Sequence, residues 1–186
     1  MLVESGFVRA ITPDGSEFTF APSFARIATL GDPQAIVALY VGLFGADAEA
    51  NARYVLGCLC EQDDPTALLG WMQGGEGAAL EWHAGTMPLA EQVLIARHLM
   101  QHGIAGKARP DGKGDGNYSD RFDAAEYVSA ARVHLGLSSA DAEALSMTEF
   151  QTMLEMKFPE QNKKRDVPSR EEYAKALVNL QEKRRG

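Results

Sequence analysis

The sequence predicts an α+β protein that is mainly α-helical: a small N-terminal β-hairpin, a helical body and a small C-terminal helical module. Three observations lead to this prediction. Apolar residues alternate with a period of two most clearly in residues 7–20. Further along the chain they recur at three- and four-residue spacing, which is typical of amphipathic helices. Helix start signals also recur, either Asp-Pro pairs or capping boxes.

The hairpin is expected to pair residues 7–11 with residues 17–20. Pro13, Asp14 and Gly15 stand between them, and these residue types favour a tight turn because proline fixes φ and glycine tolerates positive φ. Residues 78–83 fit either a short strand or an irregular turn, and the sequence does not decide between the two.

The helix from Pro88 to Gln101 carries the broadest apolar stripe, and Gly103 suits the position just after its end. Two start signals, Asp32-Pro33 and Asp64-Pro65, place a capping side chain before a proline. Helices are expected at residues 22–31, 33–44, 48–61, 65–72, 88–101, 121–135, 138–144 and 146–158, and from Ser169 onward.

Four parts follow from this pattern. Residues 1–105 form the hairpin and the helical body, and residues 106–120 are rich in glycine and aspartate and indicate a flexible linker. Residues 121–159 form the small helical module. Residues 160–186 form a basic tail with a terminal helix, which opens with a second capping box and has only a thin apolar stripe.

Charge is distributed unevenly along the 186 residues, whose formal net charge is −8. Residues 157–186 hold nine Lys/Arg and five Asp/Glu, a net of +4, which leaves 9 − 21 = −12 for residues 1–156. The tail is interpreted either as a solvated helix or as a docking segment for an acidic partner or for the body. An acidic body does not favour nucleic-acid binding.

No motif for catalysis is present. Cys58 and Cys60 have neither disulfide-framework nor zinc-knuckle spacing, and buried apolar packing in a reducing compartment is the simplest interpretation. The chain has no GxSxG elbow and no HExxH motif. It has no apolar run long enough to span a membrane and no signal peptide. The sequence therefore predicts a protein that is not an enzyme and has no cofactor.

Two patterns in the sequence share some ligands with known metal sites. His98 and His102 lie four apart on one predicted helix, but a third ligand is missing, so a surface or boundary pair is the favoured interpretation. Residues 111–122 resemble a calcium loop at some positions. Lys113 and Phe122 occupy positions that need carboxylates, so a solvated linker is expected instead. No metal site is predicted.

The C-terminal helices carry the candidate protein-binding residues. An apolar stripe with flexible methionines suits either core packing or an adaptable partner groove. The residues of this candidate site are Met147, Phe150, Met153, Leu154, Phe158, Tyr173 and Leu177.

With these residues laid out, the chain resembles the tail assembly chaperones of tailed bacteriophages, of the lambda-like kind with a body and a small C-terminal helical module. Three stretches carry the resemblance: the opening and hairpin within residues 4–24, the central helix and its exit within residues 87–107, and residues 130–150. The last stretch contains a Leu-Ser/Thr-x-x-Glu-Phe pattern at Leu145 to Phe150. The order of the three stretches, rather than any one of them, carries the resemblance.

The resemblance implies a chaperone that binds the tape-measure protein, recruits tail-tube subunits during tail assembly and is absent from the mature virion. It implies a location in the bacterial host cytoplasm, and in many phages the C-terminal module is added by a ribosomal frameshift. Self-association is also open. The alternatives are a structural virion connector or tail-completion protein, and a small helical DNA-binding regulator, which the acidic body disfavours.

Overall fold

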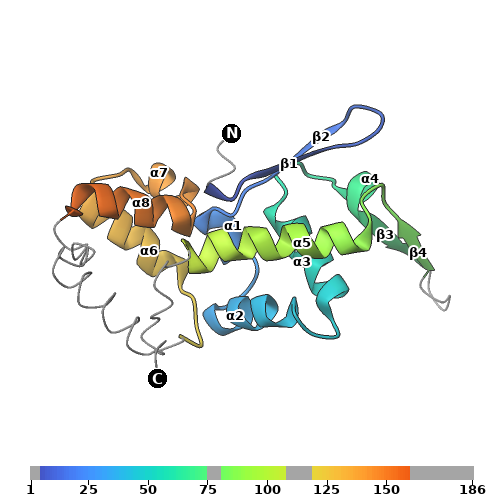
Figure 1. Cartoon of the computed structure of the whole chain (residues 1–186), viewed down its shortest axis with the longest axis horizontal. Coiled ribbons are helices and arrows are strands. Elements are labelled where there is room, and N and C mark those ends of the chain that lie inside the picture. The colour runs from blue at the N-terminus through green and yellow to red at the C-terminus, as the bar shows by residue number, and fades with distance from the viewer. Residues whose placement is uncertain (1–4, 75–80, 108–118, 160–186) are drawn as a thin grey trace, which may run out of the picture. The chain divides into compact units, whose positions relative to one another are not determined.

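The computed structural model describes residues 5–74, 81–107 and 119–159 (Figure 1). The chain divides into two compact units, Met1–Leu154 and Glu155–Gly186. The fold is mainly α-helical with a small β-hairpin near the N-terminus, as the sequence predicts, and the described residues add a second antiparallel strand pair.

The first hairpin joins β1 (Val8–Ile11) to β2 (Glu17–Phe20), with Val8 opposite Phe20. Its turn is held by Asp14, whose carboxylate accepts a hydrogen bond from the Ser16 amide (3.2 Å) and one from the Thr12 hydroxyl. These bonds lower the pKa of Asp14, and the Thr12 hydroxyl contributes most. The predicted hairpin is confirmed.

Four helices follow: α1 (Phe24–Ala28), α2 (Pro33–Gly42), α3 (Ala48–Leu59) and α4 (Thr66–Leu69). The predicted cap of α2 is present, because the Asp32 carboxylate accepts hydrogen bonds from the amides of Gln34 and Ala35 (3.1 and 2.8 Å). After α3 the chain runs antiparallel to β2, and an isolated bridge pairs Phe20 with Cys60.

The second hairpin is formed by β3 (Gly70–Gln73) and β4 (Glu81–Ala84). The sequence left open whether residues 78–83 form a strand or a turn. Residues 81–83, the described part of this segment, belong to strand β4. The prediction that the preceding helix continues to residue 72 is wrong, because Gly70 adopts φ +90° and ends α4. Just after β4, the backbone of Gly85 packs closely against the end of α4. A Cβ at Gly85 would lie 2.3 Å from the Leu68 carbonyl oxygen.

The central helix α5 (Leu89–Met100) continues into a π-helical turn, η2 (Gln101–Ala105). The prediction that Gly103 ends the helix is wrong. Gly103 lies inside η2, where its missing side chain lets the backbone approach Ile27, and Gly106 ends the turn with φ +77°.

The C-terminal helices are α6 (Ala124–Ala130), a second π-helical turn η3 (Ala131–Leu135), α7 (Ser139–Ala144) and α8 (Met147–Lys157). The capping box of α8 is confirmed. The Ser146 amide donates to the Glu149 carboxylate (3.0 Å), and the Glu149 amide donates to the Ser146 hydroxyl (3.2 Å).

The boundary of the body falls at a different place from the predicted one. Residues 121–154 belong to the same compact unit as the N-terminal elements. The Phe24 amide donates to the Leu145 carbonyl (2.8 Å), and the Phe122 amide donates to the Pro33 carbonyl (2.9 Å). Glycine content at residues 106–120 indicated a flexible connection, but it carries no information on packing between the segments that it connects. Residues 108–118 and 160–186, which are most of the predicted linker and all of the predicted tail, lie outside the described residues.

One apolar core joins the first hairpin, the helices α1 to α5 and the C-terminal helices. The side chains of its centre are fully buried, and burial of each contributes about 1.5–3 kcal/mol to folding. They include Phe20, Phe24, Ile27, Leu43, Val55, Leu56, Leu59, Leu99 and Met100.

Candidate protein-binding surfaces

The predicted binding residues of α8 separate into two groups. Met147 and Phe150 are only 3% and 5% exposed, and they belong to the apolar core. Core packing, one of the two interpretations of the stripe, therefore holds for these two residues. Met153 and Leu154 are half-buried, and Phe158 is 36% exposed. Tyr173 and Leu177 lie outside the described residues.

A different group of exposed apolar residues lies on α2 and α5, which are connected by hydrogen bonds from Arg97 of α5 to the Leu43 carbonyl at the end of α2. Val41 on α2 is 64% exposed, Phe44 just after α2 is 60% exposed, and Leu94 on α5 is 64% exposed. We call these three residues together with Arg97 the α2–α5 patch. Val41 and Phe44 are three residues apart, as are Leu94 and Arg97, so each pair lies one turn apart along its own segment.

Arg97 holds the two halves of the patch together. Its Nε and Nη2 atoms donate to the Leu43 carbonyl (3.0 and 2.7 Å), the C-cap residue of α2. Its guanidinium carbon lies 4.6 Å from the centroid of the Phe44 ring. These bonds satisfy a carbonyl at the end of a helix and place a cation where the helix dipole is negative. Phe44 is thereby fixed in an exposed position.

Tyr40 completes the packing beneath the patch. Its ring meets the Phe44 ring edge-to-face, with centroids 5.5 Å apart, and its hydroxyl donates to the Gln101 side chain (2.5 Å). Partial burial raises the pKa of the Tyr40 hydroxyl. Phe44 is therefore held by contacts with the Tyr40 ring and the Arg97 guanidinium, while much of its side chain remains exposed.

The β3–β4 hairpin carries a second group of partly exposed apolar side chains. Trp71 stacks on His83 across the strands, with centroids 5.0 Å apart and an interplanar angle of 13°. On the opposite face, Met72 stands opposite Trp82, and the Arg53 guanidinium of α3 lies 4.4 Å from the Trp82 ring centroid. Trp71 is 43% and Met72 is 52% exposed.

Neither surface was identified from the sequence. Leu94 was not part of the predicted stripe of its helix, and Phe44 falls at a predicted helix end. A signal for the hairpin existed in Trp71, Met72 and Trp82, whose flanking glycines indicated turns. Exposure at these positions depends on which neighbouring helix covers which face, and a single amphipathic pattern does not specify that.

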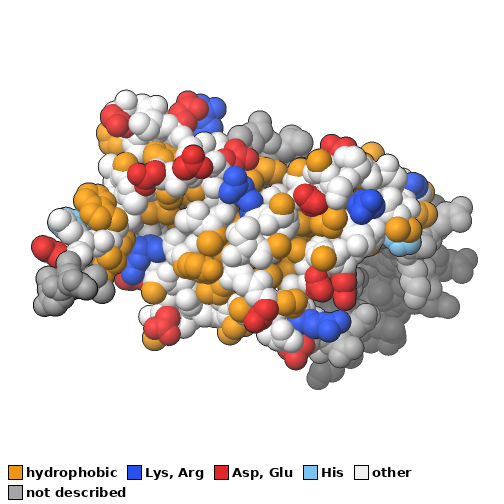
Figure 2. Space-filling model, turned by 180° about the vertical axis from the view of Figure 1, so that it is seen from behind, with side chains coloured by type: hydrophobic (Ala, Val, Ile, Leu, Met, Phe, Trp, Pro, Cys, Tyr) orange, Lys and Arg blue, Asp and Glu red, His pale blue; other side chains and the backbone are white. Residues whose placement is uncertain are grey.

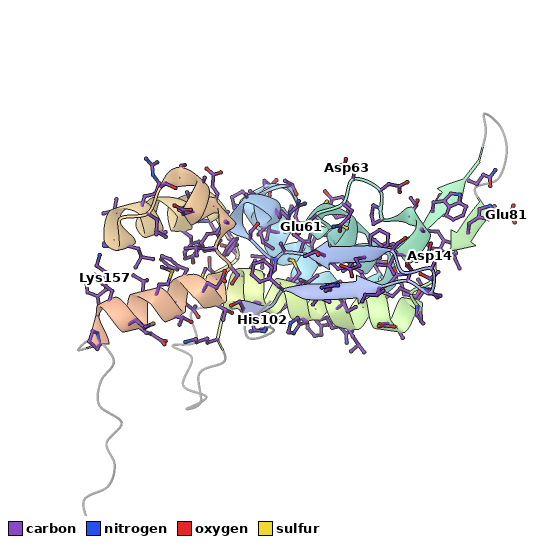
Figure 3. All side chains as sticks on the ribbon, turned by 90° about the horizontal axis from the view of Figure 1, so that it is seen from above. Asp14, Glu61, Asp63, Glu81, His102 and Lys157 are labelled. Carbon is purple, nitrogen blue, oxygen red and sulfur yellow. The ribbon has the colours of Figure 1, made fainter. Side chains whose placement is uncertain are left out.

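Acidic side chains are found on several parts of the surface of the described residues. Figure 2 shows Asp and Glu side chains spread among apolar ones on the face opposite to that of Figure 1. Three of the labelled carboxylates, Asp14, Glu61 and Asp63, lie near the first hairpin and the segment after α3 (Figure 3). The α2–α5 patch differs from this acidic surface because its charged member is an arginine.

A histidine pair lies at the junction of α5 and η2. The rings of His98 and His102 have centroids 4.5 Å apart. The Nδ1 atom of His102 lies 2.8 Å from the Thr148 hydroxyl of α8. Burial, and secondarily the neighbouring His98, lower the pKa of His102.

Within residues 5–74, 81–107 and 119–159, no group of three or more His, Cys, Asp or Glu side chains is arranged to hold a metal ion. Cys58 and Cys60 are free thiols, and burial raises the pKa of the Cys60 thiol, which makes it a poor nucleophile. No helix of the described residues is long and apolar enough to cross a membrane.

Residues 42–175 match a protein family that is described as a family of unknown function, DUF6246. The matched stretch spans more than half of the chain and includes Phe44, Leu94 and Arg97 of the α2–α5 patch, the β3–β4 hairpin and the histidine pair. No curated protein and no solved structure matches the chain.

Proposed function

The chain belongs to the family of unknown function DUF6246, and we propose that it acts by binding another protein, as a chaperone of phage tail assembly. The proposed client is the tape-measure protein, and the proposed second partner is the tail-tube protein. The proposed place of action is the host cytoplasm, and the chaperone is proposed to be absent from the mature virion.

The single observation that supports this proposal is the α2–α5 patch. Phe44, whose ring packs against Arg97, is 60% exposed, and Val41 and Leu94, three residues from Phe44 and Arg97 along the chain, are each 64% exposed. Covering an exposed side chain of this size contributes about 1.5–3 kcal/mol to association when it is fully buried. Aromatic and arginine residues are also the types that most often dominate binding energy at protein interfaces.

The character of the surface suits a chaperone for apolar helices. The patch and the β3–β4 hairpin together supply leucine, valine, methionine and aromatic side chains, which accept differently shaped apolar partners. The patch itself offers few hydrogen-bonding groups, since the Arg97 guanidinium is partly satisfied by Leu43. A client held mainly by apolar contact can be released again when its own helices find their final partners.

The resemblance to tail assembly chaperones is the reason for naming the tape-measure protein as client. That protein consists of long apolar helices in this family of assemblies, and such helices aggregate without cover. The capping-box helix α8 that carries part of the resemblance is present with both of its hydrogen bonds.

Co-expression with the tape-measure protein of the same genome tests the proposal. The wild-type chain is expected to keep the tape-measure protein soluble and to co-purify with it. The double variant Phe44→Ser/Leu94→Ser is expected to lose most of both effects, because it removes two exposed apolar groups and no core residue.

The matched control is Val133→Ser. Val133 is 78% exposed on η3 and lies outside the α2–α5 patch, so this variant removes apolar surface elsewhere. Retention by Val133→Ser with loss in the double variant supports the proposal. If the tape-measure protein stays insoluble with the wild-type chain, or if the chain is a component of purified particles, the chaperone function is wrong.

A further inference from the structure

His98 and His102 occupy one side of the helix at the end of α5. They are four residues apart, on either side of the point where α5 becomes the π-helical turn η2. Both residues are half-buried. Figure 3 labels His102 near the junction between α5 and the start of α8.

The distance between the two rings suits a shared cation. Two imidazoles that bind one metal at bond lengths of about 2.0–2.1 Å, at an angle between 90° and tetrahedral, have ring centroids about 4.5–5 Å apart. The observed centroid separation is 4.5 Å, and the rings are inclined by 53°. Two histidines at i and i+4 on a helix are also the pair that zinc-binding helices use.

The second observation is the partner of the His102 Nδ1 atom. It lies 2.8 Å from the Thr148 hydroxyl, and Thr148 is only 4% exposed. When Nδ1 carries the proton and donates to this hydroxyl, the Nε2 lone pair is available for a metal. Metal-binding histidines almost always have such a hydrogen-bond partner on the second ring nitrogen, because it fixes the tautomer and the ring orientation.

The N-terminal segment fixes the same ring from another side. Gly6 has φ +88°, and a Cβ at that position would lie 2.2 Å from the His102 Cβ. The backbone of Gly6 therefore packs directly against His102. Together, Gly6 and Thr148 hold the imidazole in one orientation before any ion binds, which reduces the entropy lost on binding.

We propose that His98 and His102 chelate one divalent transition-metal cation of the zinc, nickel and copper class. Imidazole nitrogen suits these ions, whereas magnesium and calcium prefer oxygen ligands. Within the described residues no third His, Cys, Asp or Glu joins the pair, so water or a side chain of a bound protein fills the remaining positions. The site is independent of the α2–α5 patch and of the chaperone function.

Calorimetric titration of the full chain with ZnCl₂ tests the proposal, with protein made without a histidine tag and freed of metal by a chelator. One Zn²⁺ per chain is expected to bind, NiCl₂ is expected to bind likewise, and MgCl₂ is expected not to bind. His98→Gln removes one of the two ligands and is expected to weaken Zn²⁺ binding by at least about tenfold.

Two further variants separate this site from other histidines and from misfolding. Thr148→Val preserves side-chain shape, removes the hydroxyl beside His102 and is expected to weaken Zn²⁺ binding by about tenfold. His134→Gln, on η3, is expected to leave it unchanged. Nitrogen chemical shifts of the imidazoles give a direct readout, with changes on Zn²⁺ addition expected at His98 and His102. Equal Zn²⁺ affinity of wild type and His98→Gln, or shifts confined to His83 or His134, would overturn the proposal.

Discussion

The ring of Phe24 meets the ring of Phe150 edge-to-face, with their centroids 6.0 Å apart and an interplanar angle of 71°. Phe24 begins α1 and Phe150 lies in α8, so this contact joins the two ends of the described chain. Phe122 and Tyr127 contact Phe24 as well, at 6.4 and 5.7 Å between centroids. The cluster explains why α6 to α8 are part of the same apolar core as the first helices.

Phe150→Ala is expected to lower the free energy of unfolding by about 3–5 kcal/mol, because it leaves a cavity in a fully packed aromatic cluster. Chemical denaturation followed by fluorescence and by circular dichroism measures the change. Both probes are expected to report one shared transition for residues 5–154. Two separated transitions, one for the body and one for the C-terminal helices, would show that the cluster does not couple them.

Gly70→Ala is expected to destabilise the β3–β4 hairpin strongly. The residue adopts φ +90°, which costs about 1–3 kcal/mol for a residue with a side chain. The added Cβ would also lie 2.5 Å from the His83 carbonyl oxygen, so the backbone must shift.

Gly15→Ala is the control for that substitution. Gly15 adopts φ +88°, but no heavy atom lies within 4 Å of its added Cβ. Its cost is therefore expected to be only the conformational one, about 1–2 kcal/mol. Thermal unfolding compares the two variants, and an equal loss in both would contradict the close packing at Gly70.

Ser146→Ala is expected to cost about 1 kcal/mol of stability, because the Ser146 hydroxyl accepts the Glu149 amide at the start of α8. Ser146 is fully buried, so water does not replace the lost partner. Denaturant titration measures the loss. Ser139→Ala is a suitable comparison and is expected to cost less, since the exposed Ser139 hydroxyl donates a hydrogen bond to the Glu143 side chain (2.9 Å) at the surface.

Acid is expected to destabilise the junction of α5 and η2 through His102. Burial lowers the pKa of His102 below its usual value near 6.5, so the folded chain binds fewer protons than the unfolded chain at mildly acidic pH. The stability is therefore complete above about pH 6.5 and is lost as the pH falls through the lowered pKa.

Thermal unfolding of metal-free protein between pH 7.5 and pH 5 measures this dependence. His102→Gln is expected to flatten the pH profile, whereas His134→Gln is expected to leave its slope intact. A steeper loss in His102→Gln than in the wild type would show that other groups determine the acid response.

The sequence predicted the elements that depend on local chemistry. The turn at Pro13 to Gly15, the cap at Asp32 and the capping box at Ser146 each act within a few residues, and the structure contains all three. The extent of helices was predicted less well. Gly103, inside the π-helical turn at residues 101–105, packs against Ile27, a contact with a residue that lies far away in the sequence.

The candidate site was predicted least well, for a physical reason. The pattern at Met147 and Phe150 shows which side of α8 is apolar, but not whether another element covers it. Both residues belong to the apolar core, and Phe150 packs in the aromatic cluster around Phe24. Phe44 and Leu94 are 60% and 64% exposed, although each belongs to an apolar stretch of sequence. The periodicity of one helix does not show which distant element packs on its apolar face.

The most direct test of the account is photo-crosslinking from the α2–α5 patch in cells that assemble tails. Benzoylphenylalanine replaces Phe44 in one strain and Val133 in a control strain, and both residues are exposed. The account predicts an adduct with the tape-measure protein from position 44 and none from position 133. No adduct from position 44, or equal adducts from both positions, would contradict the claim that this patch binds the client.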